Sequence, residues 1–364
     1  MTEAPIGRPR SVVADLPSYR PGKGAAQAEA EHGITGAIKL ASNENPDSPI
    51  DPILAAIDAA ARSANLYADH RATLVRERVA ERLGVSVEQV TVGNGSVGLL
   101  QQIAFSYVDP GDEVVYPWRS FEVYPVFTHL MNGVSVQVPF VAEVGFDVEA
   151  VAAAVTERTK LIFLATPNNP TGTALTTAQL RVVLDRVPQS VIVCVDEAYR
   201  EFLDPGFGDP VSELVPAYPN VVVTRTFSKA HGLAGVRAGY AVGHPEVIAT
   251  IDKTLLPFAV NALAQAAAIA AIENEAAIME RVRSILAERA RVEVELAAAG
   301  WTFPDHQGNF VWLATGERTG AITLDLERRG VVVRPFAGEG IRVTIGSPDQ
   351  NDRFLTTLAE VARP

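Results

Sequence analysis

One lysine in this sequence is set among hydroxyl groups and glycines, which suits it to covalent chemistry. Lys229 lies in the run TFSKAHG, and Arg237 follows eight residues later. A buried lysine loses its proton easily and can attack a carbonyl carbon. The guanidinium of Arg237 suits a phosphate whose other oxygens meet the hydroxyls of Thr226 and Ser228. The alternative is a solvated lysine on a surface loop.

Two polar clusters directly follow apolar runs. Asp196 ends the run that begins at Val191, and Asn169 lies in TPNNPTG, just after 161–165. Open α/β sheets bind ligands at the carboxyl ends of their strands, so Asn169 is a candidate hydrogen-bonding group. A carboxylate at the end of a buried strand needs a cationic partner. The alternatives are a tight turn at Asn169 and a helix cap at Asp196.

A glycine-rich turn lies between a predicted strand and a predicted helix. Residues 93–98 match G-x-G-x-x-G, a pattern of dinucleotide sites. The acidic residue expected after the next strand is missing, because Asp112 and Glu113 precede the run 114–116. A helix that opens at Ser96 would still direct backbone N–H groups and a positive dipole end at an anion. A nicotinamide-dependent oxidoreductase stays open as a weaker alternative.

One cofactor would use all four features. Pyridoxal 5′-phosphate (PLP) has a phosphate, a phenolic oxygen, a ring nitrogen that works beside a carboxylate, and an aldehyde that lysine captures as a Schiff base. We therefore expect PLP, with the lysine, carboxylate, amide and phosphate-binding groups converging on it. No metal site is expected.

The elements that must position these residues alternate along the chain. Helices are predicted over 51–64, with Asp51 as N-cap and Pro52 at the first helical position, and over 71–83. Strand-like runs follow at 90–92, 113–116, 134–138, 160–165, 190–195, 221–225 and 238–242. Such alternation is typical of an α/β fold with a mostly parallel seven-stranded sheet flanked by helices.

A smaller α/β domain is predicted after this region. A helical stretch over 261–299 precedes strands near 310–314, 331–334 and 341–344 and a terminal helix. We expect an N-terminal arm over 1–45 that packs on the small domain, a large PLP-binding domain over 46–258, and the small domain over 259–364.

Composition excludes several classes of protein. The 364 residues are 48% hydrophobic and 20% charged, which is too apolar for a disordered chain. The 43 acidic and 31 basic residues give a net charge of −12, which argues against nucleic-acid binding. Cys194 is the single cysteine, so we expect no disulfide framework. With no apolar leader or membrane-length segment, a cytoplasmic protein is expected.

The order of the motifs GNGS, PNNPTG, DEAY, SKAHGLAGVR and GIRVTIG resembles the fold-type I PLP aminotransferases. Within that family it resembles the histidinol-phosphate and aromatic branch. The runs LPSYRPGK (16–23) and KLASNENP (39–46) look like the amino-terminal signatures of the branch. The resemblance covers nearly the whole chain.

This resemblance implies a role for each matched residue. Lys229 becomes the Schiff-base lysine and proton carrier, Asp196 the partner of the pyridine nitrogen, and Asn169 and Tyr199 the donors to the phenolic oxygen. Phe121 matches the aromatic residue that stacks on the cofactor ring. The phosphate is implied to lie among Gly95, Ser96, Val97, Thr226, Ser228 and Arg237.

The resemblance also places the substrate and a second subunit. Arg342 matches the arginine that binds the α-carboxylate, and Arg334 assists it. Tyr19 and Asn43, in the amino-terminal signatures, are implied substrate-binding residues. Tyr67 aligns with a tyrosine that reaches the cofactor phosphate of the neighbouring subunit, which implies a homodimer with shared active sites.

Two substrates remain within the branch. Histidinol-phosphate enzymes commonly carry Asn-Glu after the Gly-Ser of the phosphate turn, whereas Val97-Gly98 stands here. This turn and the run WRSF (118–121) resemble the bacterial aromatic enzymes. The expected reaction is a ping-pong transfer of an amino group between phenylalanine, tyrosine or tryptophan and 2-oxoglutarate, with histidinol phosphate as the alternative substrate. A non-catalytic cofactor-binding regulator is a further alternative.

Overall fold

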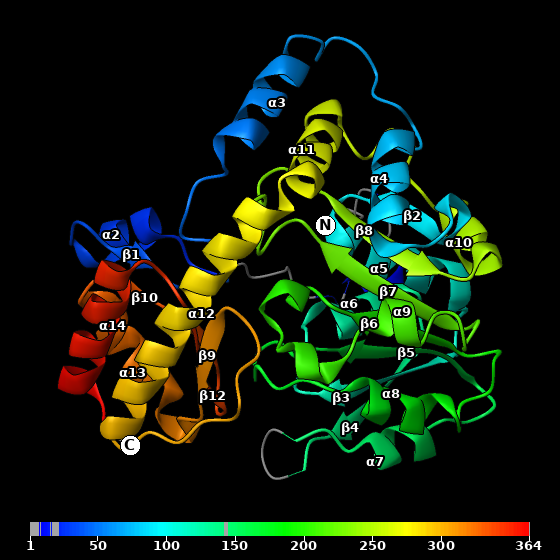
Figure 1. Ribbon diagram of the computed structural model, residues 1–364. Coiled ribbons are helices and arrows are strands. Elements are labelled where there is room, and N and C mark those ends of the chain that lie inside the picture. Colours follow the sequence, from blue (N-terminus) through cyan, green and yellow to red (C-terminus); the bar gives the residue numbers. More distant parts are fainter. Residues whose placement is uncertain (1–6, 8, 15, 17–21, 142–144, 364) are drawn as a thin grey trace, which may run out of the picture.

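The central element of the fold is a seven-stranded sheet (Figure 1). The computed structural model describes residues 7, 9–14, 16, 22–141 and 145–363. The strand order is β2-β8-β7-β6-β5-β3-β4, and β8 runs antiparallel to both of its neighbours. All seven strands expected from the sequence form: β2 (Val90–Gly93), β3 (Glu113–Trp118), β4 (Val134–Pro139), β5 (Thr159–Ala165), β6 (Ile192–Asp196), β7 (Val221–Thr226) and β8 (Gly239–Gly243).

Helices cover both faces of this sheet, because its central strands are apolar on both sides. In β5, Leu161 and Phe163 pack with α5, α6 and α10, whereas Ile162 and Leu164 belong to the core beneath α7 and α8. This is the continuous apolar run expected of a buried parallel strand. The covering helices are α5 (Gly95–Tyr107), α6 (Val123–Leu130), α7 (Val148–Ala153), α8 (Thr177–Leu184), α9 (Pro210–Glu213) and α10 (Pro245–Asp252).

The two helices expected before the sheet both form, but their ends differ from the prediction. The first, α3, spans Asp51–Ala61 and not 51–64, and Ile50 occupies the N-cap position. Asp51 and Pro52 are its first helical residues, where a carboxylate favours the helix dipole and proline lacks only an unused N–H. The second, α4, spans Thr73–Leu83.

The helical stretch expected over 261–299 is two helices. They are α11 (Ala262–Glu273) and α12 (Glu275–Ala298), and Asn274 between them has φ −115° and ψ 29°. The first packs against α3 and α4, whereas α12 leads to the smaller group of elements (Figure 1). The domain boundary at residue 259 therefore stays a prediction.

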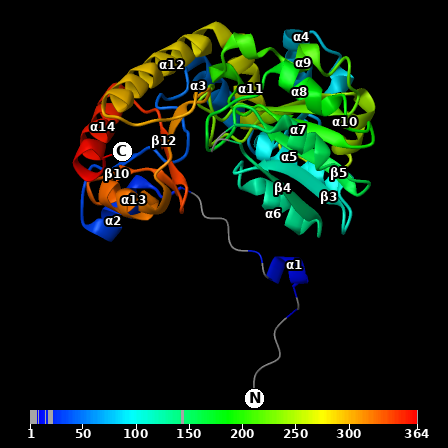
Figure 2. The same ribbon diagram turned by 90° about the horizontal axis from the view of Figure 1, so that it is seen from below.

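The smaller group of elements is built on an antiparallel sheet, β11-β12-β9, with helices beside it (Figure 2). The expected strand at 331–334 is divided, because β10 pairs with β1 and β11 pairs with β12. The parallel pair β1–β10 ties the end of the N-terminal arm to this group. Its elements are α2 (Ala25–His32), β1 (Ile38–Lys39), β9 (Phe310–Leu313), α13 (Thr319–Arg328), β10 (Val331–Val332), β11 (Arg334–Phe336), β12 (Gly340–Thr344) and α14 (Pro348–Val361).

Short elements complete the fold. A one-turn helix, α1 (Ser11–Ala14), packs against α6. Turns of 3₁₀ helix occur at Val87–Gln89, Arg200–Phe202, Pro205–Phe207 and Gly316–Arg318. Within the described part of the chain, no helix combines the length and the apolar character needed to cross a membrane.

Candidate active site

A pocket of about 210 Å³ opens where β5, β6 and β7 end and where β11 and β12 approach them. The parallel strands deliver their last residues and the following loops to this one edge. Most of the residues predicted to act together therefore line it: Ser96, Val97, Phe121, Asn169, Asp196, Tyr199, Thr226, Ser228, Lys229, Arg237, Arg334 and Arg342.

Lys229 lies three residues after the end of β7. Its Nζ donates a hydrogen bond to the carbonyl oxygen of Ser42 at 3.0 Å. Burial lowers the pKa of Lys229 to about 7, and the nearby charge of Arg342 acts in the same direction while Glu44 opposes it. A large fraction of the amine is therefore neutral at pH 7 and able to act as a nucleophile.

Asp196 is the last residue of β6 and is buried. Its Oδ2 accepts a hydrogen bond from the hydroxyl of Tyr124 at 2.9 Å, and its Oδ1 accepts one from Thr224 at 3.2 Å. Burial raises the pKa of Asp196 to about 6 in spite of these bonds. The two hydroxyls carry no charge, so a cation placed beside this carboxylate would be strongly favoured.

Tyr124 was not predicted as a site residue. Its ring lies on α6, stacked on Phe163 with ring centroids 4.5 Å apart. The sequence offered one weak signal, that Tyr124 lies only three residues after Phe121, but Phe121 precedes α6 and the two do not share a helix face. That spacing gave no indication that its hydroxyl would reach Asp196.

A cradle of hydrogen-bonding side chains forms between the start of α5 and the loop after β7. Arg237 donates from Nη1 to the Ser228 hydroxyl at 3.2 Å, and the Thr226 hydroxyl donates to the same oxygen at 3.0 Å. A Cβ built on Gly95 would lie 2.4 Å from Nη2 of Arg237. Gly95 also has φ +74°, a conformation that favours glycine, and a side chain here would displace the guanidinium of Arg237. The helix α5 begins at Gly95 with Asn94 as its N-cap, whereas the sequence predicted that it opens at Ser96.

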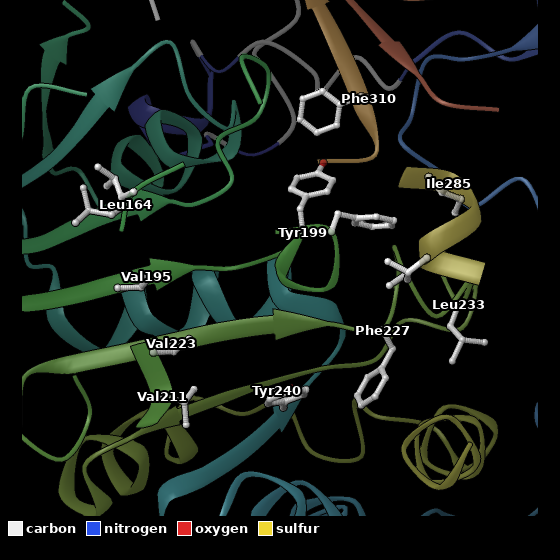
Figure 3. Packing of buried hydrophobic residues seen from close by; sticks show 14 of the residues in the cluster. Leu164, Val195, Tyr199, Val211, Val223, Phe227, Leu233, Tyr240, Ile285 and Phe310 are labelled. Atoms are coloured by element: carbon white, nitrogen blue, oxygen red, sulfur yellow. The ribbon is translucent and has the colours of Figure 1, made fainter. Parts of the chain in front are cut away.

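The hydroxyl of Tyr199 is held by a hydrogen bond from Asn43. The side-chain amide of Asn43 donates to its hydroxyl oxygen at 2.9 Å, and Asn43 is itself anchored to Thr344 of β12. The ring of Tyr199 packs edge-on against Phe310 at 5.1 Å, with its hydroxyl on the Phe310 side (Figure 3). Asn43, predicted as a substrate-binding residue, therefore contacts Tyr199 but does not line the pocket.

Two arginines form the wall on the β11–β12 side. Arg342 is buried and donates to the carbonyl of Ala41 at 2.6 Å and to the side-chain oxygen of Asn169. Arg334 lies directly opposite Arg342 in the register of the antiparallel strands β11 and β12. Its Nη2 donates to the carboxylate of Glu122 at 2.7 Å, and Glu122 also lines the pocket.

The structure does not bring Tyr67 to this pocket. The side chain of Tyr67 is 85% exposed and stacks on Phe258 with ring centroids 4.6 Å apart. Tyr19 lies outside the described residues. Gly22, which does line the pocket, shows that the N-terminal arm reaches its edge.

The glycine-rich turn does not belong to a dinucleotide-binding unit. β2, which precedes it, is an edge strand of the sheet and pairs antiparallel with β8. The dinucleotide fingerprint requires this turn within a parallel βαβ unit. The turn therefore contributes its helix end, α5, to the cradle around Arg237 without forming a nucleotide crevice.

Residues 35–358 match the family Aminotransferase class I and II. The chain belongs to this family. Among curated proteins, this aminotransferase is 48% identical over 96% of both chains to the aromatic amino acid aminotransferase of Streptomyces coelicolor. It is also 48% identical over 95% of both chains to the aromatic amino acid aminotransferase of Thermobifida fusca.

Solved structures agree with this family membership. The histidinol-phosphate aminotransferase of Sinorhizobium meliloti, solved in complex with pyridoxal 5′-phosphate, superposes with a TM-score of 0.90. It is 29% identical and covers 98% of both chains. The aminotransferase fold expected from the sequence, α/β with a mostly parallel seven-stranded sheet, is thereby confirmed.

Proposed function

We propose that this aminotransferase exchanges an amino group between aromatic amino acids and 2-oxoglutarate through PLP. One observation carries the proposal: Lys229, Asp196 and Arg342 line the same pocket. An amine nucleophile, a buried carboxylate and a carboxylate-binding guanidinium are the three groups that amino-acid chemistry on PLP requires. The names of the relatives that are 44–48% identical over about 96% of the chain support the aromatic substrate.

The residues present fit PLP. The raised pKa of Asp196, caused by burial, calls for a cation such as a protonated ring nitrogen. The close approach of Arg237 to Gly95 leaves a guanidinium and two hydroxyls at the amino end of the 13-residue helix α5, which suits a phosphate. We assign Ser96, Val97, Thr226, Ser228 and Arg237 to the phosphate and Phe121 to the face of the ring.

When bound, PLP supplies an electrophilic carbon and a ring that accepts electrons from the substrate's α-carbon. Asp196 keeps the ring nitrogen protonated, because a carboxylate in a buried site strongly favours a cation beside it. Lys229 has a pKa lowered to about 7 by burial, so its amine both gives up and takes back a proton near neutral pH. We therefore assign the proton transfers at the α-carbon to Nζ of Lys229.

The hydrogen bonds around Asn169 and Tyr199 fix what these two side chains offer. The side-chain oxygen of Asn169 accepts from Arg342, so its Nδ2 is the atom that donates into the pocket. The hydroxyl oxygen of Tyr199 accepts from Asn43, which directs the hydroxyl proton away from that amide. We assign both donors to the phenolic oxygen of the cofactor and Arg342 to the substrate's α-carboxylate.

We propose a homodimer as part of the same function. Exposed apolar side chains gather near the start of α4 and the end of α10: Leu66 is 66% exposed, Leu256 is 70% exposed, and Tyr67 stacks on Phe258. An exposed patch of this kind marks a protein interface. A tyrosine within it, here Tyr67, would complete the cradle of the neighbouring subunit.

We place the protein in the cytoplasm, because Cys194 is buried and unpaired with another cysteine.

Histidinol phosphate is the second candidate substrate. The structural similarity to the Sinorhizobium meliloti enzyme, with a TM-score of 0.90, favours it. The higher identity to the proteins named for aromatic amino acids favours the first candidate.

Steady-state kinetics separate the two candidates. The PLP-loaded protein is assayed with 2-oxoglutarate and either phenylalanine or histidinol phosphate. We expect kcat/KM for phenylalanine to be at least about tenfold higher, which corresponds to about 1.4 kcal/mol of transition-state binding. A preference for histidinol phosphate would overturn the aromatic assignment. Loss of the activity in Lys229→Ala assigns it to this pocket and not to a contaminant.

A further inference from the structure

The pocket carries two arginines with unlike surroundings. Arg334 and Arg342 are directly opposite each other on β11 and β12, so their side chains leave the same face of the sheet. Both guanidinium groups lie over the ring of Phe336, at 5.8 and 6.0 Å from its centre. The two cations are therefore neighbours on one wall.

Two hydrogen bonds of Arg342 go to neutral oxygens, those of Ala41 and Asn169. Arg334 already contacts a carboxylate, that of Glu122, at 2.7 Å. The side chains of Arg334 and Glu122 are 15% and 38% exposed, so the pair lies at the mouth and not in the depth of the pocket.

We propose that Glu122 determines specificity by serving as an internal counter-charge for Arg334. This inference rests on the proposed function, in which one pocket must accept an apolar side chain in one half-reaction and a second carboxylate in the other. An arginine beside an aromatic side chain is costly when its charge is uncompensated, and Glu122 compensates it. A dicarboxylic substrate brings its own carboxylate, displaces Glu122 and pairs with Arg334.

The chain offers a matched control for this role. Glu339 forms an ion pair with Arg119, whose Nε donates to both carboxylate oxygens at 2.7 and 2.8 Å. Like the pair Glu122–Arg334, it joins the segment between β3 and α6 to the β11–β12 hairpin. Arg119 also lies over Phe336, at 5.6 Å. Neither Glu339 nor Arg119 lines the pocket. Both Glu122→Gln and Glu339→Gln thus remove an ion pair between these two segments. Only Glu122→Gln also removes the counter-charge at Arg334.

Binding of two substrate analogues without an amino group tests the inference. Glutarate stands for the dicarboxylic substrate and 3-phenylpropanoate for the aromatic one, and calorimetry on the PLP-loaded protein measures both dissociation constants. In Glu122→Gln we expect glutarate to bind about tenfold more tightly and 3-phenylpropanoate to bind equally or less tightly. In Glu339→Gln the ratio of the two constants should stay within about twofold of the wild type.

Each outcome is decisive. An unchanged ratio in Glu122→Gln, the same change in both variants, or weaker glutarate binding in Glu122→Gln would overturn the role of Glu122 while the proposed function stands. Failure of the wild-type protein to bind either analogue would overturn the proposed substrate pair, and the inference with it. Steady-state kinetics give a second readout: KM for 2-oxoglutarate should fall in Glu122→Gln with little change in kcat.

Discussion

Removal of one hydroxyl, in Tyr124→Phe, tests how the protein sets the charge of Asp196. The hydroxyl of Tyr124 donates to Asp196 at 2.9 Å and lowers the pKa of that carboxyl, against the larger effect of burial. A hydrogen bond to a charged group contributes about 1.5–3 kcal/mol, and one pKa unit corresponds to about 1.36 kcal/mol. The variant should therefore raise the pKa of Asp196 in the apoprotein from about 6 by a further one to two units.

The assay is the dissociation constant of PLP for the apoprotein, measured by fluorescence across pH. On the proposed assignment, PLP binds the ionised form of Asp196. The ratio of variant to wild-type constants then follows the two pKa values and cancels the titration of free PLP. We expect a ratio near 1 above about pH 9 that rises to about 10–100 below about pH 6. The ring of Tyr124 still stacks on Phe163 in the variant, which preserves the packing.

Tyr116→Phe is the matched control. Tyr116 is also fully buried, and its hydroxyl lies near Gln137 at 3.5 Å, away from Asp196. This variant should give a ratio near 1 at every pH. A ratio that is independent of pH in Tyr124→Phe, or a pH dependence that both variants share, would refute the assignment of Tyr124 as the group that tunes Asp196.

Three further variants have expected outcomes. Lys229→Ala should retain PLP in the absorption spectrum but lower kcat by at least about 1,000-fold, and near-normal turnover would contradict its role. Burial raises the pKa of Asp196 from 3.8 to about 6, so this group lowers the stability of the apoprotein as the pH rises between these values. Asp196→Asn should therefore raise the unfolding free energy above pH 6, by about 3 kcal/mol at most. Thermal unfolding at pH 4 and pH 8 measures this, and an equal effect at both would contradict it. Gly95→Ala should weaken PLP binding about tenfold by displacing Arg237, whereas Gly98→Ala, with its new Cβ 3.4 Å from Asn94, should not; equal effects would contradict the cradle.

The parts of the site that sequence could predict are those governed by strand ends. Asp196 directly ends β6, and Asn169 and Lys229 follow β5 and β7 within a few residues, so the parallel sheet alone brings them together. The alternation of short apolar runs also predicted all seven strands of that sheet. These are local patterns with a known spatial consequence.

The parts that sequence could not predict depend on contacts between distant segments. Tyr124 and Asp196 are 72 residues apart, and Glu122 and Arg334 are 212 residues apart. No local pattern encodes such a pair, because each side chain is equally suited to a solvated helix face or strand. The division at Asn274 was missed for the same reason, since α11 is fixed by its packing on α3 and α4.

Chemical trapping tests the central claim, that Lys229 is the residue that carries PLP. The chain has five lysines, so borohydride reduction of the PLP-loaded protein, followed by digestion and mass spectrometry, distinguishes Lys229 from Lys23, Lys39, Lys160 and Lys253. We expect the added cofactor mass on the Lys229 peptide alone, and its loss when phenylalanine is added before the reduction. Cofactor mass on another lysine, or on none, would contradict the account.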